Sequence, residues 1–181
     1  MEDKGTLAID LGSTTTVVAY QGPDTAAQLL ALPPFSLDGP VVVPSLLWLP
    51  EAPGAKPLIG RQVVDAGLAH HDGPELRRDF KRLIGSDSAS AQPAEQAGAL
   101  LLKALWAALP SGISPKRLVL TAPIDTYRSY RQWLVQVCGE LGVQEVALVD
   151  EPTAAAIGAG PPRAAPPWWW ISEVAPWMWP W

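Results

Sequence analysis

Apolar residues divide the first part of the chain into short strands. Runs over 7–11 and 17–20 predict two strands joined by a tight polar turn, and residues 27–32 predict a third. Beyond them, proline and glycine interrupt the pattern, and only 41–49 and 58–60 still favour strands. The chain is therefore expected to open as a small antiparallel meander.

Helical and strand patterns alternate in the second part of the chain. Apolar residues recur at helical spacing over 93–109 and 127–141, and a glycine follows each run. Buried strands are predicted over 117–123 and 146–149, and residues 150–160 open a further helix with an acidic residue near its start. Because strand–helix–strand units pair their strands in parallel, we expect an α/β protein with a mixed sheet and flanking helices.

Composition narrows the classes of function. The net charge of −5 argues against a nucleic-acid partner. Cys138 is the single cysteine, which fits a reducing, cytoplasmic compartment, and it is expected to be a core residue. His70 and His71 are more consistent with the end of a helix over 61–70 than with a metal site. Neither a signal peptide nor a stretch of spanning length is visible, so no membrane partner is expected.

The turn between the first two predicted strands carries candidate chemistry. Gly12 is followed by hydroxyl residues that include Ser13, Thr14 and Thr15. A tight turn of this kind presents backbone N–H groups to phosphate oxygens, and hydroxyls add further donors. Asp10, near the end of the first strand, is placed to hold a hydrated Mg²⁺. An ordinary β-hairpin with a polar turn is the alternative.

A second candidate lies at residues 80–85, where Lys81 and Arg82 stand among three apolar residues. One interpretation is a helix end whose cations complement the helix dipole. The other is a cation that acts on phosphate. The spacing alone leaves both open, and residues 86–96 are expected to be a polar linker.

Taken in order, these segments resemble the nucleotide-binding domain of the DnaK-like heat-shock chaperones, the 70-kilodalton class. The resemblance covers residues 6–160 and includes the hairpin, Pro44-Ser45, Ile59-Gly60, 80–85 and 150–160. It implies the actin-like ATPase (ribonuclease H-like) fold. Residues 1–160 would form lobe I only, with 33–115 as an inserted outer subdomain.

The resemblance also implies roles for individual residues. Lys81 matches the catalytic lysine, Glu151 matches a glutamate that reaches the metal through water, and Asp10 matches a further metal-site and catalytic residue. The phosphate-binding turn and the interdomain switch fall on Gly12, Ser13, Thr14 and Thr15, and on Pro123 and Arg131. The implied cofactors are ATP or ADP with Mg²⁺. The implied partners are a J-domain co-chaperone and a nucleotide-exchange factor, with unfolded polypeptide clients only in a full-length parent.

A second phosphate loop, Asp-x-Gly-Gly-Gly-Thr, is expected soon after the helix at 150–160 but is not seen, and lobe II is not seen either. Residues 161–181 instead hold six of the nine tryptophans. Read one base earlier, permitted codons for 168–181 spell Leu-Val-Val-Asp-Phe-Gly-Gly-Gly-Thr-Leu-Asp-Val-Ala-Leu, the missing loop. We therefore expect a frameshift near residue 160 and an out-of-frame tail; a native tryptophan-rich tail at a membrane interface is the alternative.

The expected parent protein binds and hydrolyses ATP with Mg²⁺ to drive protein folding. A chain with one wall of the cleft is expected to bind nucleotide weakly and to show no measurable ATPase. Two alternatives remain open. Residues 150–160 also look like the bacterial cell-shape (MreB-type) actin homologues, although 80–85 and 123–132 favour the chaperone. The other alternative is a non-enzymatic fragment that binds co-chaperones through lobe I.

Overall fold

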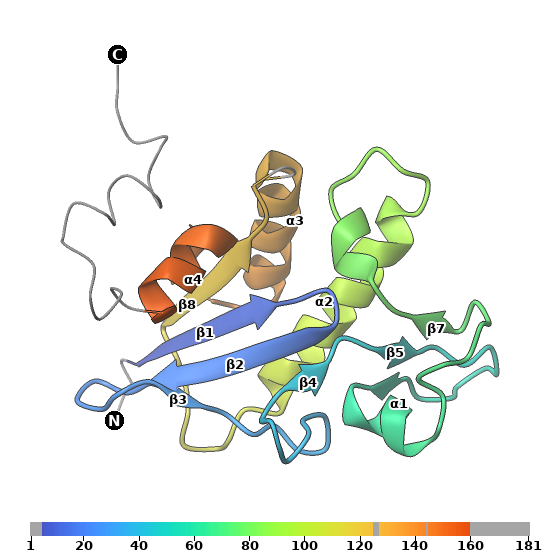
Figure 1. Ribbon diagram of the computed structural model, residues 1–181, viewed down its shortest axis with the longest axis horizontal. Coiled ribbons are helices and arrows are strands. Elements are labelled where there is room, and N and C mark those ends of the chain that lie inside the picture. Colours follow the sequence, from blue (N-terminus) through green and yellow to red (C-terminus); the bar gives the residue numbers. More distant parts are fainter. Residues whose placement is uncertain (1–4, 125–126, 144, 160–181) are drawn as a thin grey trace.

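The computed structural model describes residues 5–124, 127–143 and 145–159, and a mixed six-stranded sheet lies at its centre (Figure 1). Its strands are β1 (Thr6–Leu11), β2 (Thr15–Gln21), β3 (Gln28–Leu29), β4 (Val43–Pro44), β8 (Arg117–Ala122) and β9 (Glu145–Asp150). The order is β3-β2-β1-β8-β9, with β4 paired to β2. The predicted meander is confirmed, because β1, β2 and β3 pair antiparallel. The parallel crossovers are confirmed by the pairing of β8 with both β1 and β9.

A second, three-stranded sheet lies at the opposite end of the molecule from the last helix (Figure 1). It contains β5 (Leu47–Trp48), β6 (Leu58–Ile59) and β7 (Leu76–Arg77), with α1 (Arg61–Asp65) beside it. The single strand predicted over 41–49 is wrong: a turn in which Leu46 N–H donates to Pro44 O (2.8 Å) separates β4 from β5. That turn moves the chain from the large sheet to the small one.

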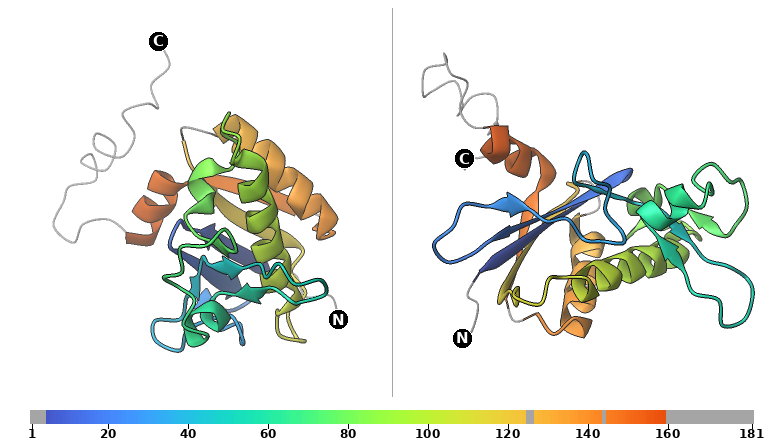
Figure 2. Two further views of the ribbon diagram at one scale, coloured as in Figure 1. Left: turned by 90° about the vertical axis from the view of Figure 1, so that its right-hand side faces the viewer. Right: turned by 90° about the horizontal axis from the view of Figure 1, so that it is seen from below.

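Helices cover both faces of the large sheet. They are α2 (Ala91–Ala107), α3 (Tyr127–Glu140) and α4 (Glu151–Ala159), and a 3₁₀ turn, η1 (Phe80–Leu83), precedes α2. Figure 2 shows α2 and α3 on one face of the sheet and α4 on the other. The described part of the chain is thus a mixed α/β structure with flanking helices, as the alternating pattern predicts.

Two helix boundaries differ from the predictions. The linker predicted over 86–96 is shorter, because α2 begins at Ala91 and not at Pro93. Proline is tolerated there, since the N–H groups of a first helical turn have no acceptor within the helix. The helix predicted over 61–70 ends early, at Asp65, and Gly67 then takes a positive φ of 72° that a helix cannot continue.

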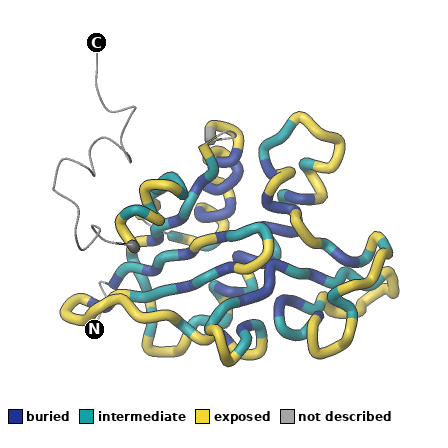
Figure 3. Tube along the Cα trace, in the orientation of Figure 1, coloured by how far each residue is buried: buried dark blue, intermediate teal, exposed yellow. Residues whose placement is uncertain are grey.

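The core lies between the large sheet and the helices α2 and α3 (Figure 3). Sheet residues such as Leu7, Leu11 and Leu120 and the α2 residue Leu101 are at most 1% exposed. The inward face of α3 is as predicted, with buried Tyr130, Trp133, Leu134 and Val137. Cys138 is a core residue, as expected, and burial raises the pKa of its thiol to about 11. The tail at 161–181 lies outside the described residues.

Candidate functional site

The predicted carboxylates Asp10 and Glu151 lie at the ends of two strands of a parallel set of three. Since β8 lies between β1 and β9, the carboxyl ends of these strands meet at one edge of the sheet. Asp10 stands at the end of β1, and Glu151 directly follows β9. Thr121, near the end of β8, donates its hydroxyl to Asp10 Oδ1 at 2.6 Å. Ligands of open α/β sheets bind outside the carboxyl ends of the strands, so this edge is the candidate site. We call it the carboxyl edge.

The turn between β1 and β2 borders this edge, and its shape depends on Gly12. A Cβ atom at this position would lie 2.2 Å from the carbonyl oxygen of Thr15, which a side chain cannot do. Thr14 and Thr15 are exposed, and Ser13 is half-buried. The turn is therefore built around a backbone approach that only glycine allows.

Ser45, a residue with no assigned role in the predicted site, fixes the turn from behind. Its hydroxyl donates to the carbonyl of Gly12 (2.8 Å), and its N–H donates to the carbonyl of Thr14 (2.8 Å). Thr16 and Ser45 also share a hydroxyl hydrogen bond of 2.9 Å. These bonds use the carbonyl side of the turn. Within the described residues, no backbone hydrogen bond of the turns and loops uses the N–H groups of Ser13 and Thr14.

Lys81 reaches the carboxyl edge from η1. The neighbouring Phe80 and Ile84 are at most 3% exposed and anchor this turn in the core. Lys81 itself is only 9% exposed, and its Nζ donates to Glu151 Oε1 in an ion pair. The two residues are 70 positions apart in the chain. Lys81 and Arg82 do lie in the last turn of η1, as the helix-end interpretation has it, but Lys81 is buried in an ion pair whereas Arg82 is exposed.

The start of α4 holds Glu151 in a defined position. Asp150 caps the helix: its Oδ1 accepts from the N–H of Thr153 and its Oδ2 from the Thr153 hydroxyl, both at 2.8 Å. These hydrogen bonds hold the pKa of Asp150 below its usual value, the backbone bond contributing most. Glu151, the first helical residue, is thereby directed toward Lys81 while 41% of its side chain stays exposed.

Tyr130 is a further residue of this region that the sequence presents only as part of the core. It is fully buried in the first turns of α3. Burial is the main cause that raises the pKa of its hydroxyl, and the negative charges of Glu151 and Asp10 raise it further. Thr121 and Tyr130 are thus residues that the motifs miss, whereas Ser45 stands in one of the motifs but receives no role there. A single hydroxyl at the end of a strand, as in Thr121, is a weak sequence signal for a site. Tyr130 stands at an apolar position of a helical pattern, so the sequence indicates only a core residue.

The two switch residues implied by the resemblance differ in how far they are buried. Pro123 follows β8 directly and is half-buried, whereas Arg131 is exposed on α3. Among the ion pairs of residues 5–124, 127–143 and 145–159, none includes Arg131. The structure does not join Arg131 to the Lys81–Glu151 pair.

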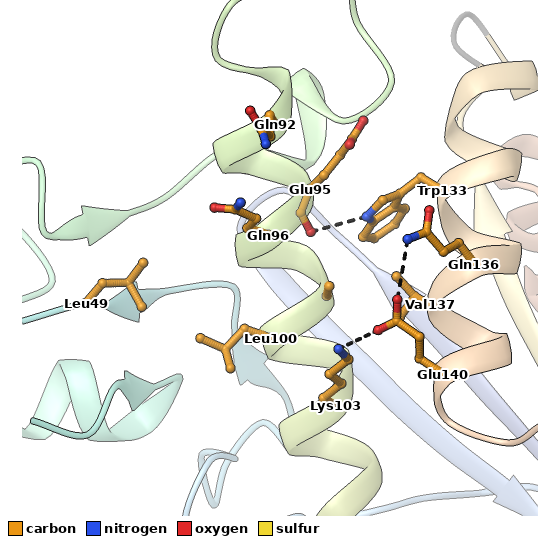
Figure 4. A pocket seen from close by; sticks show the side chains of 11 residues that line it. Leu49, Gln92, Glu95, Gln96, Leu100, Lys103, Trp133, Gln136, Val137 and Glu140 are labelled. Carbon is orange, nitrogen blue, oxygen red and sulfur yellow. Dashed lines mark hydrogen bonds and ion pairs between the residues drawn. The ribbon is translucent and has the colours of Figure 1, made fainter. Parts of the chain in front are cut away.

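A separate groove of about 590 Å³ lies between α2 and α3, with Leu49 on its rim (Figure 4). Trp133 forms one wall, and its Nε1–H donates to the backbone oxygen of Glu95 at 3.2 Å. Further along the same two helices, Lys103 Nζ lies 2.6 Å from Glu140 Oε2 (Figure 4). The hydrogen bond from Lys103 lowers the pKa of Glu140. This groove contains none of the predicted site residues.

Comparisons with known proteins assign no family to this chain. No protein-family model and no curated protein matches the chain. In the part of the chain that the structure describes, no helix is long and apolar enough to cross a membrane. The same part contains no group of three or more His, Cys, Asp or Glu side chains arranged to hold a metal ion.

Proposed function

We propose that residues 1–160 are the phosphate-binding lobe of an actin-like ATPase of the DnaK-like chaperone family. One observation carries the proposal: Lys81, nine-tenths buried, is paired with Glu151 at the carboxyl edge, beside Asp10. A buried lysine is costly unless it is paired. Its position, far in sequence from the hairpin yet at the same edge, supports a role toward an anionic ligand.

The residues at this edge fit the phosphates of ATP or ADP. Lys81 supplies a cation, and the N–H groups of Ser13 and Thr14 supply donors on a turn held from behind by Ser45. Fixed donors of this kind bind phosphate oxygens without reorganisation. Thr15 adds an exposed hydroxyl beside them.

The same edge fits Mg²⁺ in its usual hydrated form. Mg²⁺ keeps most of its waters and takes one or two carboxylates, so Asp10 and Glu151 would suffice without a three-residue cluster. Both side chains are open to solvent, and Thr121 fixes the orientation of the Asp10 carboxylate. When bound, the ion would neutralise charge on the phosphates.

This lobe supplies one wall of a nucleotide site. Donors that converge from one side only, open to water, bind weakly, so we expect a Kd for Mg·ATP of about 1 mM or higher and no measurable ATPase. In a complete protein of this family, the site would hydrolyse ATP to drive protein folding with J-domain and nucleotide-exchange partners.

Titration with Mg·ATP, followed by NMR, tests the proposal. The Lys81→Met variant keeps the apolar stem and removes the charge, so its Kd should rise at least tenfold, the usual value of a charge-assisted hydrogen bond. Lys103→Met is the matched control, because Lys103 also pairs with a glutamate but lies at the groove. Equal affinity of the Lys81→Met variant and the wild type would contradict the proposal, as would a wild-type Kd in the micromolar range.

A further inference from the structure

The strand β9 forms one edge of the large sheet, because β8 is its one neighbour among the described strands. It pairs with β8 in parallel over all six of its residues, so it contains no bulge. It also contains neither proline nor glycine. The strand at the other edge, β3, is only two residues long. Proteins usually protect sheet edges by short strands, bulges or proline, and β9 has none of these.

The backbone of β9 presents groups for further pairing. Glu145 N–H donates to the carbonyl of Lys116 at 3.2 Å, so the backbone groups of Glu145 are directed toward β8. Because successive residues of a strand point these groups to opposite sides, those of Val146 and Leu148 point away from β8. Within the described residues, no backbone hydrogen bond of the turns and loops uses them. β9 can therefore pair with another strand.

The side chains of β9 suit an apolar partner. Val146 is 36% exposed, and Ala147, Leu148 and Val149 are only half-buried. The side chains of an added strand would lie beside them on both faces of the sheet and remove them from water. Apolar and β-branched residues are therefore expected in the central positions of a partner segment.

The charges at the two ends of β9 decide which partner fits. Glu145 is exposed at one end, and Asp150 and Glu151 stand at the other. In a two-fold dimer, antiparallel β9 strands centred on Leu148 would bring the acidic ends of the two copies together. Like charges placed opposite each other destabilise a sheet. A strand with Lys or Arg at each end instead places a cation beside each acidic end, whichever way the strand runs.

We propose that β9 is a docking strand for an extended segment of another polypeptide, with apolar residues at the centre of the segment and Lys or Arg at each end. The segment would extend the sheet through backbone hydrogen bonds to Val146 and Leu148. This surface follows the length of β9, whereas the nucleotide is proposed to bind at the carboxyl edge. The role of β9 therefore goes beyond the proposed function and does not depend on it.

Binding of a designed peptide to the full chain tests this role. The probe is Lys-Val-Thr-Val-Thr-Val-Lys with blocked ends, and NMR should show slower hydrogen exchange at the amides of Val146 and Leu148 when it binds. The same peptide N-methylated at every central residue has few N–H groups to donate and should not bind. A peptide with Glu in place of both Lys should bind about tenfold more weakly at low salt, because it repels both ends of β9.

Val146→Pro is the matching change in the protein. Proline removes the outward N–H of this residue and leaves the hydrogen bonds of Glu145 and Ala147 to β8, which an edge strand tolerates. The variant should bind the peptide at least about tenfold more weakly, the value of one or two hydrogen bonds. Val146→Thr keeps the N–H and should bind as the wild type does. If Val146→Pro does not fold, the N-methylated peptide still tests the pairing in the unchanged protein.

Four results would overturn this role. Equal binding of the N-methylated peptide would exclude backbone pairing, and equal binding of the peptide with Glu would exclude a basic partner. Slow exchange of Val146 and Leu148 without peptide would show that β9 is already covered, by a second copy if it depends on protein concentration and by this chain itself if it does not. Absence of binding at millimolar peptide would exclude the docking strand and leave the proposed function standing.

Discussion

Two lysine–glutamate ion pairs lie in different regions of this protein and differ in their surroundings. At the carboxyl edge, Lys81 is 9% exposed and Glu151 is 41% exposed. At the groove between α2 and α3, Lys103 and Glu140 are 46% and 45% exposed. The groove has a volume of about 590 Å³, yet the more buried of the two lysines lies at the edge.

The difference teaches that two ion pairs of the same residue types can differ widely in how far their charges are removed from water. An exposed ion pair is screened and contributes little, typically 0–1 kcal/mol at most sites. A buried cation needs its partner, because an unpaired charge in a medium of low dielectric is strongly unfavourable. At the carboxyl edge the Asp10 carboxylate also accepts a hydrogen bond from Thr121, and at the groove Trp133 donates to the backbone oxygen of Glu95.

The largest expected effect follows from removing one anion in each region. Glu151→Gln leaves the buried Lys81 without its counter-charge and should lower the free energy of unfolding by about 3 kcal/mol. Glu140→Gln removes an exposed charge and should lower the free energy of unfolding much less, and 1 M salt should abolish this small loss. Urea denaturation measures both. Equal losses in the two variants would show that the ion pairs do not differ as their burial indicates.

The next largest effect on stability is expected when one glycine near the carboxyl edge and one glycine of α2 are each replaced by alanine. Gly12→Ala places a Cβ against the backbone of Thr15, which cannot yield easily, and should cost about 2 kcal/mol of stability. At Gly98 in α2 the nearest atoms, at 2.8 Å and 3.0 Å, belong to the side chains of Trp133 and Ile84, which can adjust. The gain in helix propensity, about 1 kcal/mol, offsets part of that cost. Thermal unfolding of both variants measures the two losses, and Gly12→Ala should lose more stability. A greater loss for Gly98→Ala would contradict this prediction.

The smallest effect is expected from a change of pH. It concerns the thiol of Cys138, whose pKa is shifted by burial and not by neighbouring charges. Burial alone raises the pKa of Cys138 from 9.0 to about 11, so the unfolded chain releases this proton first as pH rises. The stabilising contribution is therefore complete below pH 9 and should be lost between about 9 and 11, by about 1–2 kcal/mol. The Cys138→Ala variant should show a shallower decline, and added salt should not alter the difference. A decline of equal slope in both proteins would contradict this.

Much of the fold could be predicted because its signals are local. The spacing of Trp133, Leu134 and Val137 determines the buried face of α3, and the runs at β1, β8 and β9 determine parallel strands. The two-residue strand β7 was missed because only its pairing with β5 defines it. The division of 41–49 between two sheets depends on contacts of Ser45 with the turn at Gly12, 33 residues away.

The candidate site could be predicted only where a motif stands in the sequence. Motifs predict Asp10, Lys81 and Glu151, but strand order brings Asp10 and Glu151 to one edge, and the ion pair of Lys81 with Glu151 cannot be read from spacing. Tyr130 looks like any core residue, and nothing in its helical position reveals an unpaired hydroxyl. The frameshift proposed for 161–181 stays a prediction, which the nucleotide sequence downstream of codon 160 tests.

The most direct test of the central claim is a map of where Mg·ATP binds. Backbone amide NMR spectra recorded over a millimolar titration should show shifts that saturate together at Ser13, Thr14, Lys81, Thr121 and Glu151. The groove residues Gln92, Gln96 and Gln136 should show none. Shifts confined to the groove, or to neither region, would contradict the account.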